Sequence, residues 1–166
     1  VSANKKMIAE HLPELLELQK QNDISFLYEA ACCASIPVIR NLEEYYDNDL
    51  LHSINSVVNG STNYILTKMF EENLSFHNAL LQAQQLGFAE SNPALDVEGY
   101  DALNKWTFLL THAYGVLPKK GELVFTGIQN ITREDAQQAV RKDYVINLVA
   151  SAQKMKNGKV AAFVLP

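Results

Sequence analysis

The chain has 166 residues, of which 48% are hydrophobic and 20% are charged, and its net charge is −5. These proportions are typical of one globular domain, and the acidic balance argues against a nucleic-acid binder, which concentrates Lys and Arg on one surface. The seven glycines are so widely spaced that neither GxGxxG nor GxxxxGK(S/T) occurs, so the chain lacks the usual backbone cradle for a dinucleotide or a nucleoside triphosphate.

Apolar spacing predicts an amphipathic helix near the N-terminus, over 5–22, which Pro13 is expected to break or kink. From Asp23 onward the apolar period changes to two, and this pattern predicts a strand over 24–29. The small residues of 30–35 then predict a tight loop.

The middle of the chain carries clear boundary signals, which predict a helix over 37–46, a strand over 52–58, and helices over 61–72 and 76–86. The last of these helices has Ser75 in the N-cap position.

The C-terminal half combines helix and hairpin signals. An aperiodic loop over 88–98 precedes a helix over 99–114. Capping-box spacing predicts a further helix over 132–142. Two β-rich runs, 144–156 and 159–165, flank an Asn-Gly pair, which is a strong signal for a β-hairpin.

Together these elements predict one α+β domain over 1–166, with a mixed, partly antiparallel β-sheet covered on one face by helices. The final apolar strand reaches the end of the chain without a polar tail, so we expect both ends to be cut from a longer protein.

Two adjacent cysteines, Cys32 and Cys33, cannot form an ordinary unstrained disulfide or a CxxC metal clamp. They favour a reducing compartment, and small packing residues are a better interpretation of them than reactive thiols. The apolar stretches are shorter than the roughly 18 residues that a membrane span needs, and no signal peptide is recognisable. We therefore expect a cytoplasmic protein without a membrane or nucleic-acid partner.

Five ionisable residues crowd into sixteen positions: Glu90, Asp96, Glu98, Asp101 and Lys105. Asp101 and Lys105 are four residues apart and share a helix face, so one interpretation is an ordinary solvated ion pair. The helix is apolar on both sides of this face, which favours partial burial. A partly buried lysine beside carboxylates is also a candidate acid–base group, so both interpretations stay open.

The same region carries a family resemblance. Residues 86–105 read LGFAESNPALDVEGYDALNK, which resembles the homoserine dehydrogenase signature LG(Y/F)AE-x-(D/N)P-x-x-D(V/L)-x-G-x-D-x-x-x-K at every fixed position. Further segments agree in order and spacing, namely SANK at 2–5, YEA at 28–30 followed by IP at 36–37, and NGSTNYIL at 59–66. The resemblance covers the substrate-binding and dimerisation region of that family.

The resemblance implies reduction of L-aspartate 4-semialdehyde to L-homoserine with NAD(P)H. Lys105 matches the lysine that gives a proton to the aldehyde oxygen, and Asp101 would orient it and bind substrate. Glu90 and Asp96 match carboxylates that hold homoserine, and Thr62 lies in a loop implied to form part of the substrate pocket. Because negative charge develops on the oxygen during reduction, a positioned ammonium would stabilise the transition state and then deliver the proton.

Two positions, Lys5 and Gly87, match residues that touch the cofactor near its reactive end. The resemblance begins just after the family's nucleotide-binding domain, which is expected to be missing from this chain. It therefore implies that the isolated chain is inactive, and it implies a homodimer.

A monovalent cation, Na⁺, is implied at a turn after Glu29, held by that glutamate and by the backbone carbonyls of Cys32, Ala34 and Ile36. Members of the family usually have a glycine-rich turn here, whereas this chain has Cys-Cys-Ala-Ser. Side-chain changes spare carbonyl ligands, but a Cβ atom penalises the positive φ angles that glycine adopts.

Two hypotheses of different classes follow. The chain is either the catalytic and dimerisation domain of a homoserine dehydrogenase or a non-enzymatic dimerisation or amino-acid-binding module on the same scaffold. The intact set Glu90, Asp96, Asp101 and Lys105 favours the enzyme, because a purely structural module has no physical need for all four.

Overall fold

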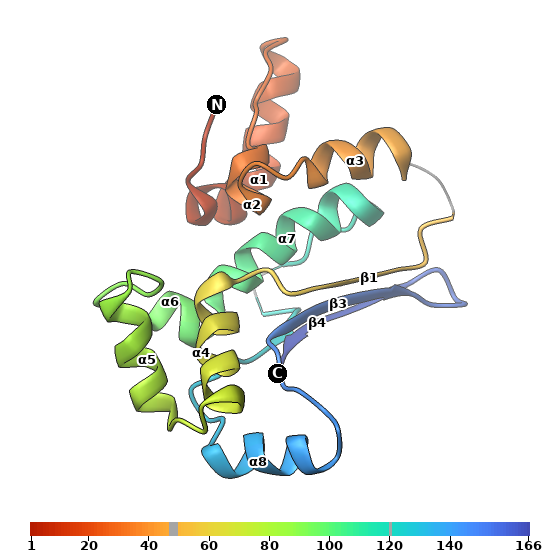
Figure 1. The fold of residues 1–166 in the computed structure, drawn as a ribbon. Coiled ribbons are helices and arrows are strands. Elements are labelled where there is room, and N and C mark those ends of the chain that lie inside the picture. The colour runs from red at the N-terminus through yellow and green to blue at the C-terminus, as the bar shows by residue number, and fades with distance from the viewer. Residues whose placement is uncertain (47–49, 120) are drawn as a thin grey trace.

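The computed structural model describes residues 1–46, 50–119 and 121–166. These residues form eight helices and four strands (Figure 1): α1 Lys5–Gln21, α2 Glu29–Cys33, α3 Val38–Tyr45, β1 Ser53–Ser56, α4 Gly60–Glu71, α5 Phe76–Gln85, α6 Ala94–Val97, α7 Tyr100–Tyr114, β2 Val124–Phe125, α8 Arg133–Arg141, β3 Val149–Lys154 and β4 Val160–Leu165. None of the helices in these ranges is long and apolar enough to cross a bilayer.

The sheet has the order β1-β3-β4-β2 and is mixed. β1 and β4 both run antiparallel to β3, and β2 runs parallel to β4. Along β3 and β4 the residues that face the helices are buried, as at Ala150, Ala152 and Val164, whereas Phe163 on the other face is exposed. The prediction of a mixed, partly antiparallel sheet covered on one face by helices is therefore confirmed.

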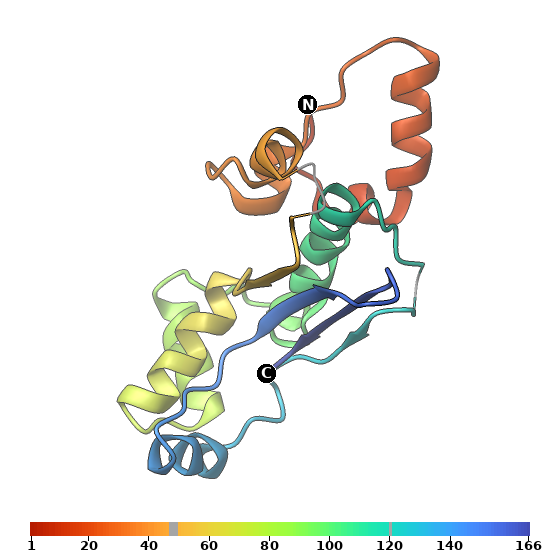
Figure 2. The ribbon, with the colours of Figure 1, turned by 90° about the vertical axis from the view of Figure 1, so that its right-hand side faces the viewer.

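Helix α7 is the central element of the molecule. It packs against β3 and β4 on one side and against α1, α2 and α3 on the other. Figure 1 shows it between the N-terminal helices above and the sheet below, and Figure 2 shows the same layering after a quarter turn. Its side chains Trp106, Phe108 and Leu110 are essentially fully buried, so this one helix joins the two layers into a common core.

The helix boundaries follow the expected local chemistry. The Asn4 side chain caps α1, and the backbone of α1 departs from helical geometry at His11, two residues before Pro13, which confirms the predicted kink. Ser75 caps α5, and Gly115 ends α7 in the left-handed conformation. Thr132 and Asp135 form the predicted capping box of α8.

The predicted strand over 24–29 is wrong. Residues 24–28 form no regular element, and Glu29 begins helix α2, so the loop predicted over 30–35 is also helical as far as Cys33. A period-two pattern needs a neighbouring strand to become a strand. Here Ile24 and Leu27 are each 59% exposed, and the backbone contact of Leu27 is a single bond to Ser2.

Four smaller differences concern strands and short helices. β1 is shorter than the predicted 52–58, and β3 begins at Val149 rather than at residue 144. The loop predicted over 88–98 contains the one-turn helix α6, and the two-residue strand β2 was not predicted. Elements this short carry too few residues for a recognisable period.

A buried tyrosine ties the N-terminal helices to α7. The Tyr28 hydroxyl lies 2.7 Å from His112 Nε2, and His112 Nδ1 lies 2.7 Å from a carboxylate oxygen of Glu43 on α3. Burial, and then the negative charge of Glu43, raise the pKa of Tyr28 to about 12. The phenol therefore stays neutral and serves as a structural link.

Candidate active site

Two side chains of opposite charge lie one helical turn apart on α7. Lys105 Nζ is 2.7 Å from Asp101 Oδ2, and the two side chains are only 15% and 11% exposed. The partial burial inferred from the apolar flanks of this helix is therefore confirmed. This pair is shielded from water, unlike a fully solvated ion pair, which contributes at most about 1 kcal/mol to folding stability.

The Lys105 ammonium has a second partner on another element. Its Nζ donates a 2.7 Å hydrogen bond to the carbonyl oxygen of Val58, in the segment that joins β1 to α4. An ammonium carries three N–H donors, and two are engaged by the described residues. The lysine head is thus fixed from two directions and keeps one donor for a bound molecule.

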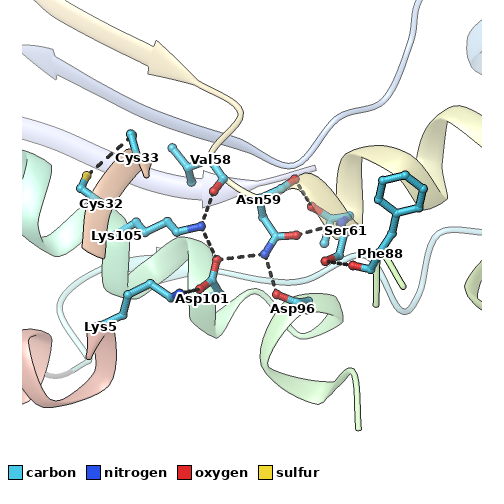
Figure 3. A network of polar contacts seen from close by, with 11 residues as sticks. Lys5, Cys32, Cys33, Val58, Asn59, Ser61, Phe88, Asp96, Asp101 and Lys105 are labelled. Atoms are coloured by element: carbon cyan, nitrogen blue, oxygen red, sulfur yellow. Dashed lines mark hydrogen bonds and ion pairs between the residues drawn. The ribbon is translucent and has the colours of Figure 1, made fainter. Parts of the chain in front are cut away.

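Asn59, at the start of α4, links the carboxylates of Asp96 on α6 and Asp101 on α7 (Figure 3). Its Nδ2 donates to Asp96 Oδ1 at 2.7 Å and to Asp101 Oδ2 at 2.9 Å, while its Oδ1 accepts from the Thr62 backbone N–H at 2.8 Å. Asn59 is only 4% exposed. One buried amide therefore caps α4 and sets the spacing of the two acidic side chains.

The environment of Asp101 keeps its carboxylate ionised. Burial by itself raises the pKa of Asp101, but hydrogen bonds from Lys105 and Asn59, together with the charges of Lys105 and Lys5, outweigh burial and lower it. Lys5 Nζ lies 3.5 Å from Asp101 Oδ1, and the Lys5 side chain is 40% exposed. Asp101 thus faces two ammonium groups, one fixed and one at the surface.

The loop after α5 is held against the start of α4. Ser61 Oγ donates to the Phe88 carbonyl at 2.6 Å, and the Tyr64 and Phe88 rings stack with centroids 4.5 Å apart. Thr62 is completely buried, and its hydroxyl donates to the Asn59 carbonyl. In this conformation the Thr62 hydroxyl cannot reach a substrate, so its effect on the site passes through Asn59.

The remaining predicted site residues lie on this loop and on α6. Gly87 and Glu90 are both exposed, and Gly87 has a positive φ of 78°. Asp96 is half-buried and is joined to Asp101 by the Asn59 amide. Contacts thus connect Lys5, Asp96, Asp101 and Lys105, whereas the network in Figure 3 does not include the side chain of Glu90.

The turn predicted to bind Na⁺ uses several of the predicted ligand groups for hydrogen bonds within the chain. The two carboxylate oxygens of Glu29 accept the backbone N–H groups of Ile39 and Arg40, and the Ile36 carbonyl accepts the N–H of Val38 at 2.8 Å. Both groups are therefore already acceptors within the chain. Cys32 lies inside α2, and Ala34 adopts the glycine-type conformation, with φ +53° and ψ −116°. The positive φ expected of the glycine turn is thus present at Ala34. The Na⁺ prediction is nevertheless not supported, because Glu29 and the Ile36 carbonyl already accept hydrogen bonds within the chain.

Close backbone packing fixes the junction between α6 and α7. Ile128 N donates to the Val97 carbonyl at 2.7 Å, and a Cβ atom on Gly127 would overlap that carbonyl oxygen. A Cβ atom on Gly99, which opens α7 with φ +88°, would lie 3.0 Å from the Thr126 carbonyl oxygen. Two glycines therefore let the 126–128 segment hold the junction that carries Asp96 and Asp101.

The sequence interpretation missed Asn59 as a functional side chain. Asn59 and Gly60 follow the strand predicted over 52–58 and mark its end, but an asparagine before a predicted helix is also an N-cap signal. That signal could have revealed the cap. The bonds to Asp96 and Asp101 join residues 37 and 42 positions away, and no local pattern encodes them.

A model of the family described as homoserine dehydrogenase matches residues 37–166, which is more than half of the chain. The chain belongs to this family. It is 40% identical over 154 residues to a homoserine dehydrogenase of Helicobacter pylori, covering 93% of this chain and 36% of that protein. A homoserine dehydrogenase of Bacillus subtilis is 38% identical over 154 residues, with coverage of 93% and 36%.

Solved homoserine dehydrogenases have the same fold. The structure from Thiobacillus denitrificans aligns with a TM-score of 0.90 at 33% identity, covering 98% of this chain and 37% of that one. A hyperthermophilic archaeal homoserine dehydrogenase in complex with NADPH aligns with a TM-score of 0.76 at 34% identity, with coverage of 98% and 46%. The chain thus spans little more than a third of the two curated relatives described above.

Proposed function

We propose that this chain binds L-aspartate 4-semialdehyde and donates the proton in its NAD(P)H-dependent reduction to L-homoserine. Family membership supports the reaction class. The observation that carries the proposal is the Lys105 ammonium, fixed by Asp101 and Val58 with one N–H donor left over. In the biosynthesis of threonine and methionine, this reaction supplies the common precursor.

Lys105 performs the acid step. As hydride reaches the carbonyl carbon, negative charge grows on the aldehyde oxygen, and the free N–H of Lys105 stabilises it and then transfers the proton from Nζ to that oxygen. Asp101 remains ionised because its pKa is lowered, so it holds the ammonium in one place throughout. Proton donation and electrostatic stabilisation thus come from a single side chain.

The neighbouring carboxylates bind the amino-acid part of the substrate. Asp96 is positioned by the Asn59 amide, and Glu90 extends from the adjoining loop into solvent. Both suit the ammonium and hydroxyl groups of homoserine, since a carboxylate accepts charge-assisted hydrogen bonds. Thr62 contributes indirectly, because its backbone N–H fixes the Asn59 side chain.

A bound nicotinamide would supply the hydride. Within this chain Lys5 and Gly87 fit such a group: the Lys5 ammonium is partly exposed beside Asp101, and a Cβ atom on Gly87 would meet open space. Neither residue provides a pyrophosphate cradle, so the rest of the cofactor requires a nucleotide-binding domain outside these 166 residues.

The expected assembly is a homodimer in the cytoplasm. The sheet face opposite the helices includes the exposed apolar side chains Val124 and Phe163, which suit pairing with a second copy. Cys32 and Cys33 are both free thiols, which is consistent with a reducing compartment.

Replacing Lys105 by alanine in the full-length protein tests the proposal. We expect kcat for NADPH oxidation with saturating aspartate semialdehyde to fall by about 10²–10⁴-fold, the usual contribution of a general acid. Lys68→Ala is the matched control, since it removes another i,i+4 helical ion pair, at 2.6 Å from Glu72, and should leave kcat unchanged. Near-normal turnover of Lys105→Ala would refute the acid role of Lys105, whereas a full-length parent protein without NADPH oxidation would favour a non-enzymatic binding module.

A further inference from the structure

Two sulfur atoms lie close enough to the proposed proton donor, Lys105, for its charge to act on both thiols. Cys32 and Cys33 end helix α2, and their Sγ atoms are 3.8 Å apart. Figure 3 shows both side chains on the same side of α7 as Lys105. Cys32 is 3% exposed, Cys33 is half-buried, and neither takes part in a disulfide. The role proposed for Lys105 makes no use of either thiol.

The two thiols differ in acidity. The contact with Cys32 and the positive charge of Lys105 outweigh burial and lower the pKa of Cys33 to about 7. The same contact, together with burial, raises the pKa of Cys32. The pair therefore combines a nucleophilic thiolate at neutral pH with a neighbouring thiol that still holds its proton.

The geometry excludes the common uses of paired cysteines. Adjacent Cα atoms are about 3.8 Å apart, below the roughly 4.4 Å minimum of ordinary disulfides. A structural zinc ion requires four ligands, and the part of the chain that the structure describes contains no cluster of three or more His, Cys, Asp or Glu side chains suited to a metal. The site offers two sulfurs only.

Two sulfurs at this separation match a soft centre that forms two bonds to sulfur. Sulfurs bonded at about 2.3 Å to one tetrahedral centre, as in zinc thiolates, lie about 3.8 Å apart. A pyramidal trivalent arsenic needs a slightly shorter separation, which a small rotation of the half-buried Cys33 side chain provides. Soft thiolates prefer such thiophilic centres over oxygen-seeking ions.

We propose that Cys32 and Cys33 form a dithiol site that captures trivalent monosubstituted arsenicals, R–As(OH)₂, and thereby blocks the site at Lys105. Two As–S bonds form and two As–O bonds break. The two hydroxide groups leave as two water molecules with the thiol protons, solvent supplying the proton where Cys33 starts as a thiolate. Arsenic remains trivalent, so the step needs no oxidant or reductant. The inhibitory part of this inference depends on the proposed function, whereas the binding part does not.

Phenylarsine oxide added to the full-length protein tests the binding part. We expect the mass of the intact protein to show one adduct at this pair, which persists in excess 2-mercaptoethanol and is removed by 2,3-dimercaptopropanol. Cys33 is the more accessible of the two residues. The adduct of Cys33→Ser, and likewise that of Cys32→Ser, should be removed by excess 2-mercaptoethanol, a monothiol. An adduct that monothiol removes from the parent protein, or that survives in both variants, would overturn the proposal.

Initial rates measured on the same samples test the inhibitory part. Each protein is compared with its own untreated rate, so a change in basal activity does not matter. The parent protein should lose at least about 90% of its rate, while treated Cys33→Ser keeps its own. A stable adduct with full activity would overturn the blocking role. If the untreated parent protein has no activity but still forms the adduct, that result would contradict the proposed function and leave the arsenical binding intact.

Discussion

Replacing Asn59 by serine separates the two roles of its side chain. Serine caps a helix about as well as asparagine, so the bond to the Thr62 N–H can be replaced. A serine hydroxyl is too short to reach Asp96 and Asp101, so the Nδ2 bonds of 2.7 and 2.9 Å are lost. The substitution therefore removes the link between the carboxylates and keeps the cap.

The bond to Asp101 sets the expected magnitude. Hydrogen bonds to charged groups contribute about 1.5–3 kcal/mol, and Asp101 is too buried for water to replace the lost donor fully. Asp96 is half-buried, so water can replace its lost donor, and the bond to Asp96 adds less to the energy lost than the bond to Asp101. If this energy holds Asp101 and Lys105 in the reactive arrangement, its loss lowers kcat by about 10- to 150-fold.

The same bond affects the pH dependence of stability. Because the folded pKa of Asp101 is lowered, its stabilisation is present above the unfolded pKa of about 3.9 and is lost as the pH falls through the folded value. Removing the Asn59 donor reduces that lowering. The difference in unfolding free energy between the parent and Asn59→Ser should therefore be largest near neutral pH and shrink below about pH 3.9.

Two measurements check this reasoning in the full-length protein: kcat for NADPH oxidation, and urea unfolding at pH 7 and pH 3. Asn59→Ala serves as the comparison, since it removes the cap as well and should lose about 1 kcal/mol more stability. Wild-type kcat together with unchanged stability at pH 7 in Asn59→Ser would refute the argument.

Three further outcomes are expected. Glu90→Gln should raise KM for aspartate semialdehyde more than it lowers kcat, with Glu98→Gln as an exposed control, and an unchanged KM would exclude the ammonium contact. The isolated 166-residue chain should show no NADPH oxidation above background, so measurable turnover would contradict the need for a separate nucleotide-binding domain. Thr132→Ala breaks the capping box of α8 and should lower the unfolding free energy by about 0.5–2 kcal/mol without changing kcat, whereas an unchanged urea midpoint would contradict it.

Local signals predicted helix α7, which carries Asp101 and Lys105. Gly99 and Gly115 bound α7, the four-residue spacing placed Asp101 against Lys105, and the apolar residues on both flanks indicated that the pair is partly buried. Each of these inferences uses residues within one helix, where the geometry is fixed at 3.6 residues per turn.

The errors arose where tertiary contacts decide the structure. Residues 24–29 have a strand pattern but no strand beside them, and 30–33 became helical instead. The Val58 carbonyl and the Asn59 amide reach the site from 42 or more positions away from their partners on α7.

The close passage of the 126–128 segment over the α6–α7 junction has a wider consequence. Thr126 N donates to the Val164 carbonyl of β4, and Ile128 N donates to the Val97 carbonyl beside Asp96. The sheet is therefore joined to the segment that carries Asp96 and Asp101 through main-chain hydrogen bonds and through the close backbone approach that Gly127 permits. Because one three-residue segment makes both bonds, a shift of β4 is expected to move the α6–α7 junction and with it Asp96 and Asp101. The spacing of Asp96 and Asp101 thus depends on the sheet as well as on the Asn59 amide.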